Sequence, residues 1–281
     1  MLKLAWLVLA SRAVAFRPSY GFERASTRLS SSQFEDETHL RLAFEAAAPR
    51  QAELGAYGEL PLDAFGAVLR QPVVSAALRA AATRDDGAAG FVDVGSGRGR
   101  LVDTVARAKI AAVGIEANRA LHESAAASFA ADAELRAESI CADVYAEADA
   151  DGAADATRAL RAADLVVCYS TAFPCDDGLR LPELSVALAS SMRAGSVAVT
   201  TDKWLVGRRF RFAAHATLPG EDEGGEPIQA FIWQLVGAPR DANIERAEVE
   251  LQWMGDDACG DNPEACDALM SALGMDGDDE D

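Results

Sequence analysis

Residues 91–100 read FVDVGSGRGR. The apolar run Phe91–Val94 predicts a short buried strand, and a helical stretch begins at Gly99. A strand, a glycine-rich turn and a helix in this order are typical of nucleotide-binding sites, because glycines let a ligand approach the backbone without meeting a Cβ atom. The glycines alternate with other residues, so they do not follow the GxGxxG spacing of dinucleotide-binding dehydrogenases.

Asp93 narrows the choice of ligand. It stands just before the turn, where a carboxylate can accept a hydrogen bond from the amino group of S-adenosylmethionine, directly or through water. The same pattern also fits a turn without a ligand, in which Asp93 serves only as a helix cap. We predict that this segment binds S-adenosylmethionine.

Two more acids follow the next two predicted strands. Glu116 ends the run 111–116, where an acid can accept hydrogen bonds from both ribose hydroxyls of the cofactor. Asp143 follows the run 137–141, where its carboxylate can accept from the adenine amine or serve only as a turn or cap residue. Val144 beside it offers a backbone N–H and an apolar contact. Ligands bind at the carboxyl ends of strands in open α/β sheets, so the three acids together predict one cofactor site.

The rest of the chain alternates in the same way. The predicted strands are 91–94, 111–116, 137–141, 164–169 and 196–201, and the predicted helices are 99–109, 118–131, 153–162 and 181–192. Strands separated by helices imply a parallel sheet. The last two strand-like runs, 210–218 and 228–237, have no helix between them and predict an antiparallel hairpin. The expected fold is α/β: a Rossmann-like, seven-stranded, mostly parallel sheet with a terminal antiparallel hairpin, in the element order of class I methyltransferases.

Helices are also expected before the sheet. Phe34–Arg50 and Leu62–Ala82 carry apolar residues near helical spacing. Pro61 suits the first turn of the second helix, and Pro72 predicts a kink or a break within it.

A second short motif, Tyr57-Gly58-Glu59-Leu60, precedes the glycine turn. Together with FVDVGSGRGR it resembles the non-SET histone lysine methyltransferases of the disruptor-of-telomeric-silencing class. The resemblance implies that residues 57–60 form a loop over the cofactor. The cofactor contacts that it implies elsewhere come from Phe91, Asp93, Gly95, Ser96, Gly97, Gly99, Arg100, Glu116, Asp143 and Val144.

The segment after the fourth strand departs from that family. The family has Asn-Asn-Phe-Ala-Phe beside its methyl-transfer channel, whereas this chain has Tyr169-Ser170-Thr171-Ala172-Phe173. We expect Tyr169 and Phe173 to be the catalytic aromatic pair that lines the channel, with packing in the core as the alternative. Lys203 and Trp204, after the fifth strand, either line the same channel mouth or are a surface lysine and a buried tryptophan.

These residues predict an S-adenosylmethionine-dependent methyltransferase. Methyl transfer from a sulfonium needs positioning and desolvation, and it requires no metal or nucleophilic side chain. The resemblance implies a protein lysine as the methyl acceptor. Two alternatives stay open: a small-molecule methyltransferase of the plastid, and a non-catalytic cofactor-binding protein.

Charge and cysteine content limit the partners. The formal net charge is −19, which argues against nucleic acid, because phosphates attract Lys and Arg. Five cysteines, an odd number, do not predict a disulfide framework, and the spacing of Cys and His predicts no metal site. We expect a monomer, with no membrane span in the mature chain, whose partner is a protein or small-molecule methyl acceptor.

The two ends differ from the body. Residues 1–32 combine a signal-peptide pattern with an Arg-, Ser- and Thr-rich stretch, and they resemble the bipartite presequence of algae with secondary plastids, including Phe16 after the expected cleavage point. The alternative to a presequence is a disordered N-terminal tail with no targeting role. The alternative locations of the protein are the nucleus and the secretory pathway. The expected organisation continues with a helical segment at 33–85, a methyltransferase domain at 86–254 and an acidic, disordered tail at 255–281.

A fusion of residues 1–40 to a fluorescent protein tests the presequence. We expect the fusion to enter the plastid of an alga with secondary plastids, as seen by co-localisation with chlorophyll fluorescence. Fluorescence in the cytosol or the nucleus would contradict plastid targeting.

Overall fold

The structure is a computed structural model. It describes residues 60–84, 86–146, 150–170, 173, 175, 179–220 and 227–254. The expected helix Phe34–Arg50, the residues Tyr57–Glu59, the expected presequence and the acidic tail lie outside the described residues.

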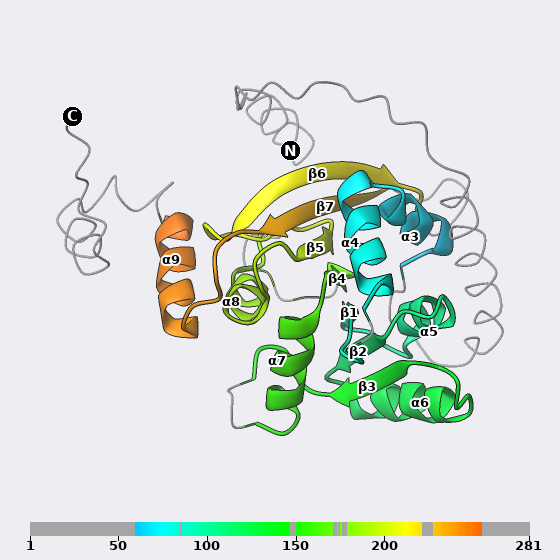
Figure 1. Cartoon of the computed structure of the whole chain (residues 1–281). Helices are drawn as coiled ribbons and strands as arrows, with labels where there is room; N and C mark the ends of the chain where they lie inside the picture. Colours follow the sequence, from blue (N-terminus) through cyan, green and yellow to red (C-terminus); the bar gives the residue numbers. More distant parts are fainter. Residues whose placement is uncertain are drawn as a thin grey trace, which may run out of the picture. The chain divides into compact units, whose positions relative to one another are not determined.

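One sheet of seven strands organises the fold (Figure 1). Its strands are β1 (Phe91–Val94), β2 (Ala112–Glu116), β3 (Ala137–Cys141), β4 (Leu165–Cys168), β5 (Val197–Thr201), β6 (Phe210–Leu218) and β7 (Ile228–Leu235). Their order across the sheet is β3-β2-β1-β4-β5-β7-β6. Neighbours from β3 to β5 pair in parallel, whereas β7 is antiparallel to both β5 and β6. The predicted sheet, mostly parallel with an antiparallel hairpin at its end, is confirmed.

Helices cover both faces of this sheet. On one face lies the first core cluster, to which α3 (Leu62–Leu69), α4 (Pro72–Ala82), α5 (Arg100–Arg107) and α6 (Arg119–Ala130) contribute. On the other face lies the second core cluster, to which α7 (Ala153–Ala162) and α8 (Pro182–Ser191) contribute. The last helix, α9 (Ala242–Met254), packs on α8.

Burial on both faces explains the composition of the central strands. Every residue of β1, β2, β4 and β5 is buried. Strands covered on both sides read as continuous apolar runs rather than as alternating patterns, since neither face meets water. The acids among them, Asp93 and Glu116, lie at or beside the carboxyl ends of their strands, so the sheet presents them at one edge.

Pro72 divides the single helix expected over residues 62–82. Helix α3 ends at Leu69, and α4 begins with Pro72 in its first turn. A proline is tolerated there because its missing N–H would have no partner within the helix. The predicted break is confirmed, and both helices bury apolar residues in the first core cluster.

Gly99 allows α6 to pack against the turn that follows β1. Its backbone is left-handed, with φ of 78°. A Cβ atom built on it would lie 2.3 Å from Cζ of Phe129 and 3.2 Å from Cβ of Ala125, both on α6. Backbone conformation and space therefore both select glycine at this position.

The substitution Gly99→Ala should lower the free energy of unfolding by about 2–4 kcal/mol, the sum of left-handed backbone strain and overpacking against Phe129. Gly195→Ala is the matched control, since Gly195 also has a left-handed φ, 86°, but nothing lies within 4 Å of the added Cβ. Its expected cost is about 1 kcal/mol. Chemical denaturation followed by circular dichroism measures both, and equal costs would show that α6 accommodates the methyl group.

Candidate functional site

The carboxyl ends of β1, β2 and β3 lie next to one another at one edge of the sheet. The strand order also reverses at β1, because β2 pairs on one side of it and β4 on the other. Ligands bind at such switch points in open α/β sheets. Asp93 is the last residue but one of β1, Glu116 ends β2, and Asp143 comes shortly after β3. The structure thus brings the three predicted acids to one edge.

The carboxylate of Glu116 joins the turn after β1 to the start of α6. It accepts a 2.8 Å hydrogen bond from the backbone N–H of Gly97 on one oxygen and a 2.8 Å bond from that of Asn118 on the other. Glu116 is 8% exposed. A carboxylate oxygen has two lone pairs, so each oxygen keeps one for a further donor.

The turn itself rests on β2. The backbone N–H groups of Gly95 and Ser96 both donate to the carbonyl oxygen of Ile115, at 2.8 and 3.2 Å. A Cβ atom on Gly114 would lie 2.5 Å from Oγ of Ser96. Only a glycine at this position of β2 therefore lets the turn after β1 pack so closely on the strand. The buried Ser96 Oγ has no hydrogen-bond partner in the described part of the chain.

Gly114 is a residue of the site that the sequence analysis did not identify. It lies in the middle of the apolar run AAVGIE, where a glycine weakens a strand unless another backbone approaches closely. A glycine inside a predicted strand was therefore the sequence signal that could have identified this residue.

Asp93 is buried, with 4% of its surface exposed. Burial, with a smaller contribution from the negative charge of Asp93, raises the pKa of the Cys168 thiol well above its usual range. The carboxylate therefore acts on the end of β4 as well as on β1. The Cys168 thiol stays protonated, and a protonated thiol is a poor nucleophile.

Asp143 forms a local turn at the end of β3. Its exposed side chain accepts a 3.0 Å hydrogen bond from the backbone N–H of Tyr145. This is the turn role that the sequence left open, and the second carboxylate oxygen does not take part in that bond. Val144 is half-buried and packs against the second core cluster. Tyr145 also packs there, and burial raises the pKa of its hydroxyl.

Phe173 lies against the glycine turn. A Cβ atom on Gly95 would lie 2.9 Å from Cε1 of the Phe173 ring, so the ring is in contact with the turn. The ring also meets Tyr145 edge to face, with 6.5 Å between centroids. Nζ of Lys203 donates a 2.7 Å hydrogen bond to the carbonyl oxygen of Phe173. Phe173 and Lys203, both considered from the sequence, are thus brought to the same edge.

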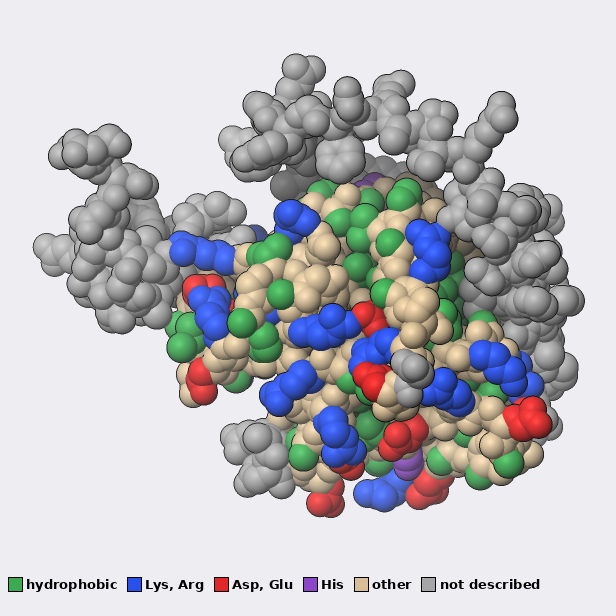
Figure 2. All heavy atoms as spheres, viewed as in Figure 1, with side chains coloured by type: hydrophobic (Ala, Val, Ile, Leu, Met, Phe, Trp, Pro, Cys, Tyr) green, Lys and Arg blue, Asp and Glu red, His purple; other side chains and the backbone are tan. Residues whose placement is uncertain are grey.

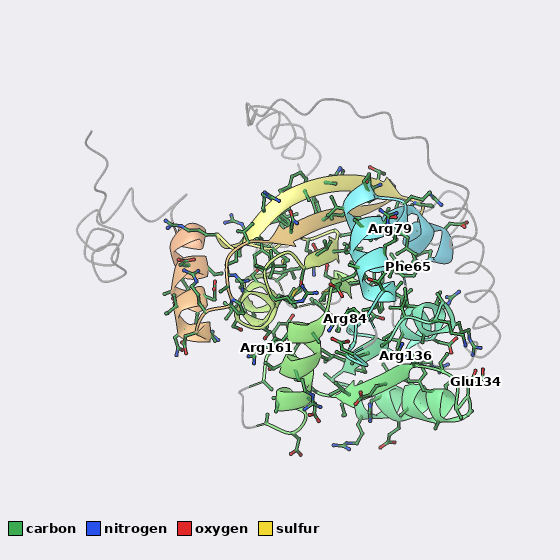
Figure 3. All side chains as sticks on the ribbon, viewed as in Figure 1. Phe65, Arg79, Arg84, Glu134, Arg136 and Arg161 are labelled. Carbon is green, nitrogen blue, oxygen red and sulfur yellow. The ribbon has the colours of Figure 1, made fainter. Side chains whose placement is uncertain are left out.

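Three of the predicted site residues lie elsewhere. Phe91 starts β1, at its amino end, and its fully buried ring packs edge to face on Phe65, which Figure 3 labels. Leu60 is 2% exposed and belongs to the same first core cluster. Tyr169 packs against the first core cluster, whereas Phe173 packs against the second. The side chains of Phe91 and Leu60 therefore serve the core, and Tyr169 does not form one aromatic wall with Phe173.

Trp204 is half-buried, which is nearer to the buried tryptophan of the two alternatives that the sequence left open. Its half-buried ring meets Phe231 edge to face, with 5.8 Å between centroids. Its backbone N–H donates to the carbonyl oxygen of Leu179 at 2.9 Å. Arg100 begins α5 and is partly buried.

Cations gather on the face of the molecule seen in Figure 2. Figure 3 labels Arg79, Arg84, Arg136 and Arg161 there. Arg84 precedes β1, Arg136 precedes β3 and Arg161 precedes β4, so these cations lie by the amino ends of the strands. Arg84 forms ion pairs with Asp86 and Asp164. The edge that carries Asp93, Glu116 and Asp143 is the opposite one.

Among the described residues, no group of three or more His, Cys, Asp or Glu side chains could hold a metal ion. None of their helices is both long enough and apolar enough to cross a membrane.

No protein-family model and no curated protein matches this chain. Solved structures with a similar arrangement include the mitomycin 7-O-methyltransferase MmcR, with 17% identity, a TM-score of 0.38 and coverage of 61% of this chain and 55% of that one. An RNA methyltransferase from Salinibacter ruber in complex with S-adenosyl-L-homocysteine has 25% identity, a TM-score of 0.38 and coverage of 61% and 96%. Magnesium protoporphyrin IX methyltransferase from Synechocystis PCC 6803 with S-adenosyl-L-homocysteine has 13% identity, a TM-score of 0.41 and coverage of 71% and 99%. This chain therefore spans about half the length of MmcR.

The strand order and the antiparallel end pair identify the architecture. The fold is that of a class I methyltransferase. Asp93, Glu116 and the glycine turn lie at the switch-point edge of this sheet, the edge at which ligands bind in open α/β sheets.

Proposed function

We propose that this protein is an S-adenosylmethionine-dependent methyltransferase whose acceptor is a protein lysine. The observation that carries the proposal is the pair of hydrogen bonds that the buried Glu116 carboxylate accepts from Gly97 and Asn118. Each carboxylate oxygen keeps a lone pair for a further donor at the switch-point edge. A buried carboxylate is costly unless donors satisfy it, and the two hydroxyls of a ribose are suitable donors.

The residues at this edge fit the chemistry of the cofactor. S-adenosylmethionine carries an ammonium group, a ribose diol and an adenine amine. Asp93 complements the ammonium, Glu116 the diol and Asp143 the amine, in the order of adjacent strands β1, β2 and β3. The unpaired hydroxyl of Ser96, inside the glycine turn, is a further polar group at this edge.

The bound cofactor would supply an activated methyl group on sulfur, and the protein would supply positioning and exclusion of water. The Phe173 ring lies against Gly95, and Tyr145 packs on Phe173. Apolar rings therefore line the site on the side of β4. Cys168 carries a thiol whose pKa burial has raised, so it does not compete with the acceptor as a nucleophile.

A lysine acceptor rests on the resemblance of Tyr57–Leu60 and of residues 91–100 to lysine methyltransferases. A lysine amine must lose its proton before it can attack the methyl group. An apolar surrounding favours the neutral amine by lowering its pKa, and the Phe173 ring contributes such a surrounding.

Ser170 favours a second candidate, a small-molecule acceptor. Its backbone N–H donates to Oγ1 of Thr201 at 3.0 Å, its Oγ donates to the carbonyl oxygen of Thr201 at 2.6 Å, and the N–H of Thr201 donates to that Oγ at 3.0 Å. These bonds use the N–H and the hydroxyl of Ser170 to tie β4 to β5, whereas the amide of an asparagine could reach an acceptor. Acceptor recognition at this position therefore differs from that of the family with two asparagines.

Asp93→Ala should weaken binding of S-adenosylhomocysteine by about 10- to 100-fold, because one charge-assisted hydrogen bond is lost. Isothermal titration calorimetry measures the affinity. Asp155→Ala is the matched control: Asp155 lies on α7, is exposed and pairs only with Arg158 among the interactions described. Equal affinity in all three proteins would refute the site.

Labelled S-adenosylmethionine and plastid extract separate the acceptors. After incubation, the extract is split into protein and metabolite fractions, and methyl-lysine is sought in acid hydrolysates of the protein. We expect label on protein lysine with the wild type and none with Asp93→Ala. Label confined to the metabolite fraction would establish the small-molecule candidate, and cofactor binding without label in either fraction would mean a non-catalytic protein.

A further inference from the structure

Lys203 joins the segment after β5 to the segment after β4. We propose that Lys203 is a positioning residue for methyl transfer, which holds the Phe173 ring against the glycine turn. This inference rests on the proposed function, because it concerns the same site.

The contact between Lys203 and Phe173 is direct. Nζ of Lys203 donates to the carbonyl oxygen of Phe173 at 2.7 Å, in a partly buried setting. The backbone N–H of Phe173 donates to the carbonyl oxygen of Ser170 at 3.1 Å. These two bonds fix both polar groups of the Phe173 backbone, and its ring then rests on Gly95. A charged donor makes a stronger hydrogen bond than a neutral one.

Lys203 follows a turn that is hydrogen-bonded to β7. Asp202, which precedes it, has a left-handed φ of 59°. The N–H of Asp202 donates to the carbonyl oxygen of Gln229 at 2.7 Å, and the N–H of Gln229 donates to Oδ1 of Asp202 at 2.9 Å. The sheet neighbour β7 therefore fixes the backbone from which the Lys203 side chain reaches Phe173.

Trp204 anchors the same segment further along. Its N–H donates to the carbonyl oxygen of Leu179 at 2.9 Å, and its own carbonyl oxygen accepts from the N–H of Leu181 at 3.0 Å. The connection from β4 to α8 is thus tied to the end of β5 at two places, by Trp204 near α8 and by Lys203 at Phe173. Only the tie by Lys203 lies beside the glycine turn.

The position of the Phe173 ring matters for methyl transfer because the ring is already in place before the cofactor binds. A wall that is already in place costs no ordering entropy during the reaction, and it keeps water from one side of the site. Without the ammonium group the backbone carbonyl of Phe173 would have to find another donor, and water is the nearest substitute. The ring would then leave Gly95 for part of the time.

The test compares Lys203→Met with Lys203→Arg, because methionine keeps the apolar stem without the charge and arginine keeps a donor. We expect Lys203→Met to lower the rate of labelled methyl transfer at saturating cofactor by about 10- to 100-fold, the effect of one charge-assisted hydrogen bond. Lys203→Arg should restore the rate to within about threefold. Hydrogen–deuterium exchange should also be faster in Lys203→Met than in the wild type at the peptide that contains Gly95 and Gly97.

Thermal unfolding and calorimetry with S-adenosylhomocysteine separate the outcomes. Unchanged exchange and an unchanged rate in Lys203→Met, in a wild type that binds the cofactor product, would overturn this inference alone. Equal losses of rate and of melting temperature in both variants would also overturn it, since the inference requires arginine, which keeps a charged donor, to restore the rate. Failure of the wild type to bind S-adenosylhomocysteine would remove the proposed function, and this inference with it.

Discussion

The carboxylate of Glu116 is the interaction on which the candidate site depends. It accepts from the N–H of Gly97 and from that of Asn118, so one side chain links the turn after β1 to the first turn of α6. Removal of the carboxylate would leave the N–H of Gly97 without this partner at a buried position, which is costly. The shape of the turn therefore depends on the residue that ends β2.

Close packing under the turn supports that link. Gly114 lacks the Cβ atom that would meet Ser96, and Gly99 lacks the one that would meet Phe129. The two glycines let the turn pack closely between β2 and α6. The carboxylates at the strand ends are then held close to the turn, and the edge offers acceptors to a ligand that carries donors.

The periodicity of the sequence was sufficient for most of the fold. The predicted strands and helices of the sheet region agree with β1 to β7 and with α5 to α8, because strands buried on both faces must be apolar throughout and crossover helices must alternate with them. Helix α9 was not predicted. It is anchored by Arg240, which pairs with the buried Glu245 and with Glu248 and lowers the pKa of the Glu248 carboxyl. Ion pairs of this kind do not produce the apolar periodicity from which helices are predicted.

For the site, the sequence by itself determined which acids stand at which strand ends. Chain order and strand direction put Asp93, Glu116 and Asp143 at the same edge once the sheet is parallel. The tertiary structure alone decided which neighbours each residue meets. It placed Phe91 and Leu60 in the core, separated Tyr169 from Phe173 and brought Lys203 to Phe173. Spacing along the chain fixes the direction of a side chain relative to its own strand, whereas contacts between segments far apart in sequence arise only when the sheet and its loops pack together.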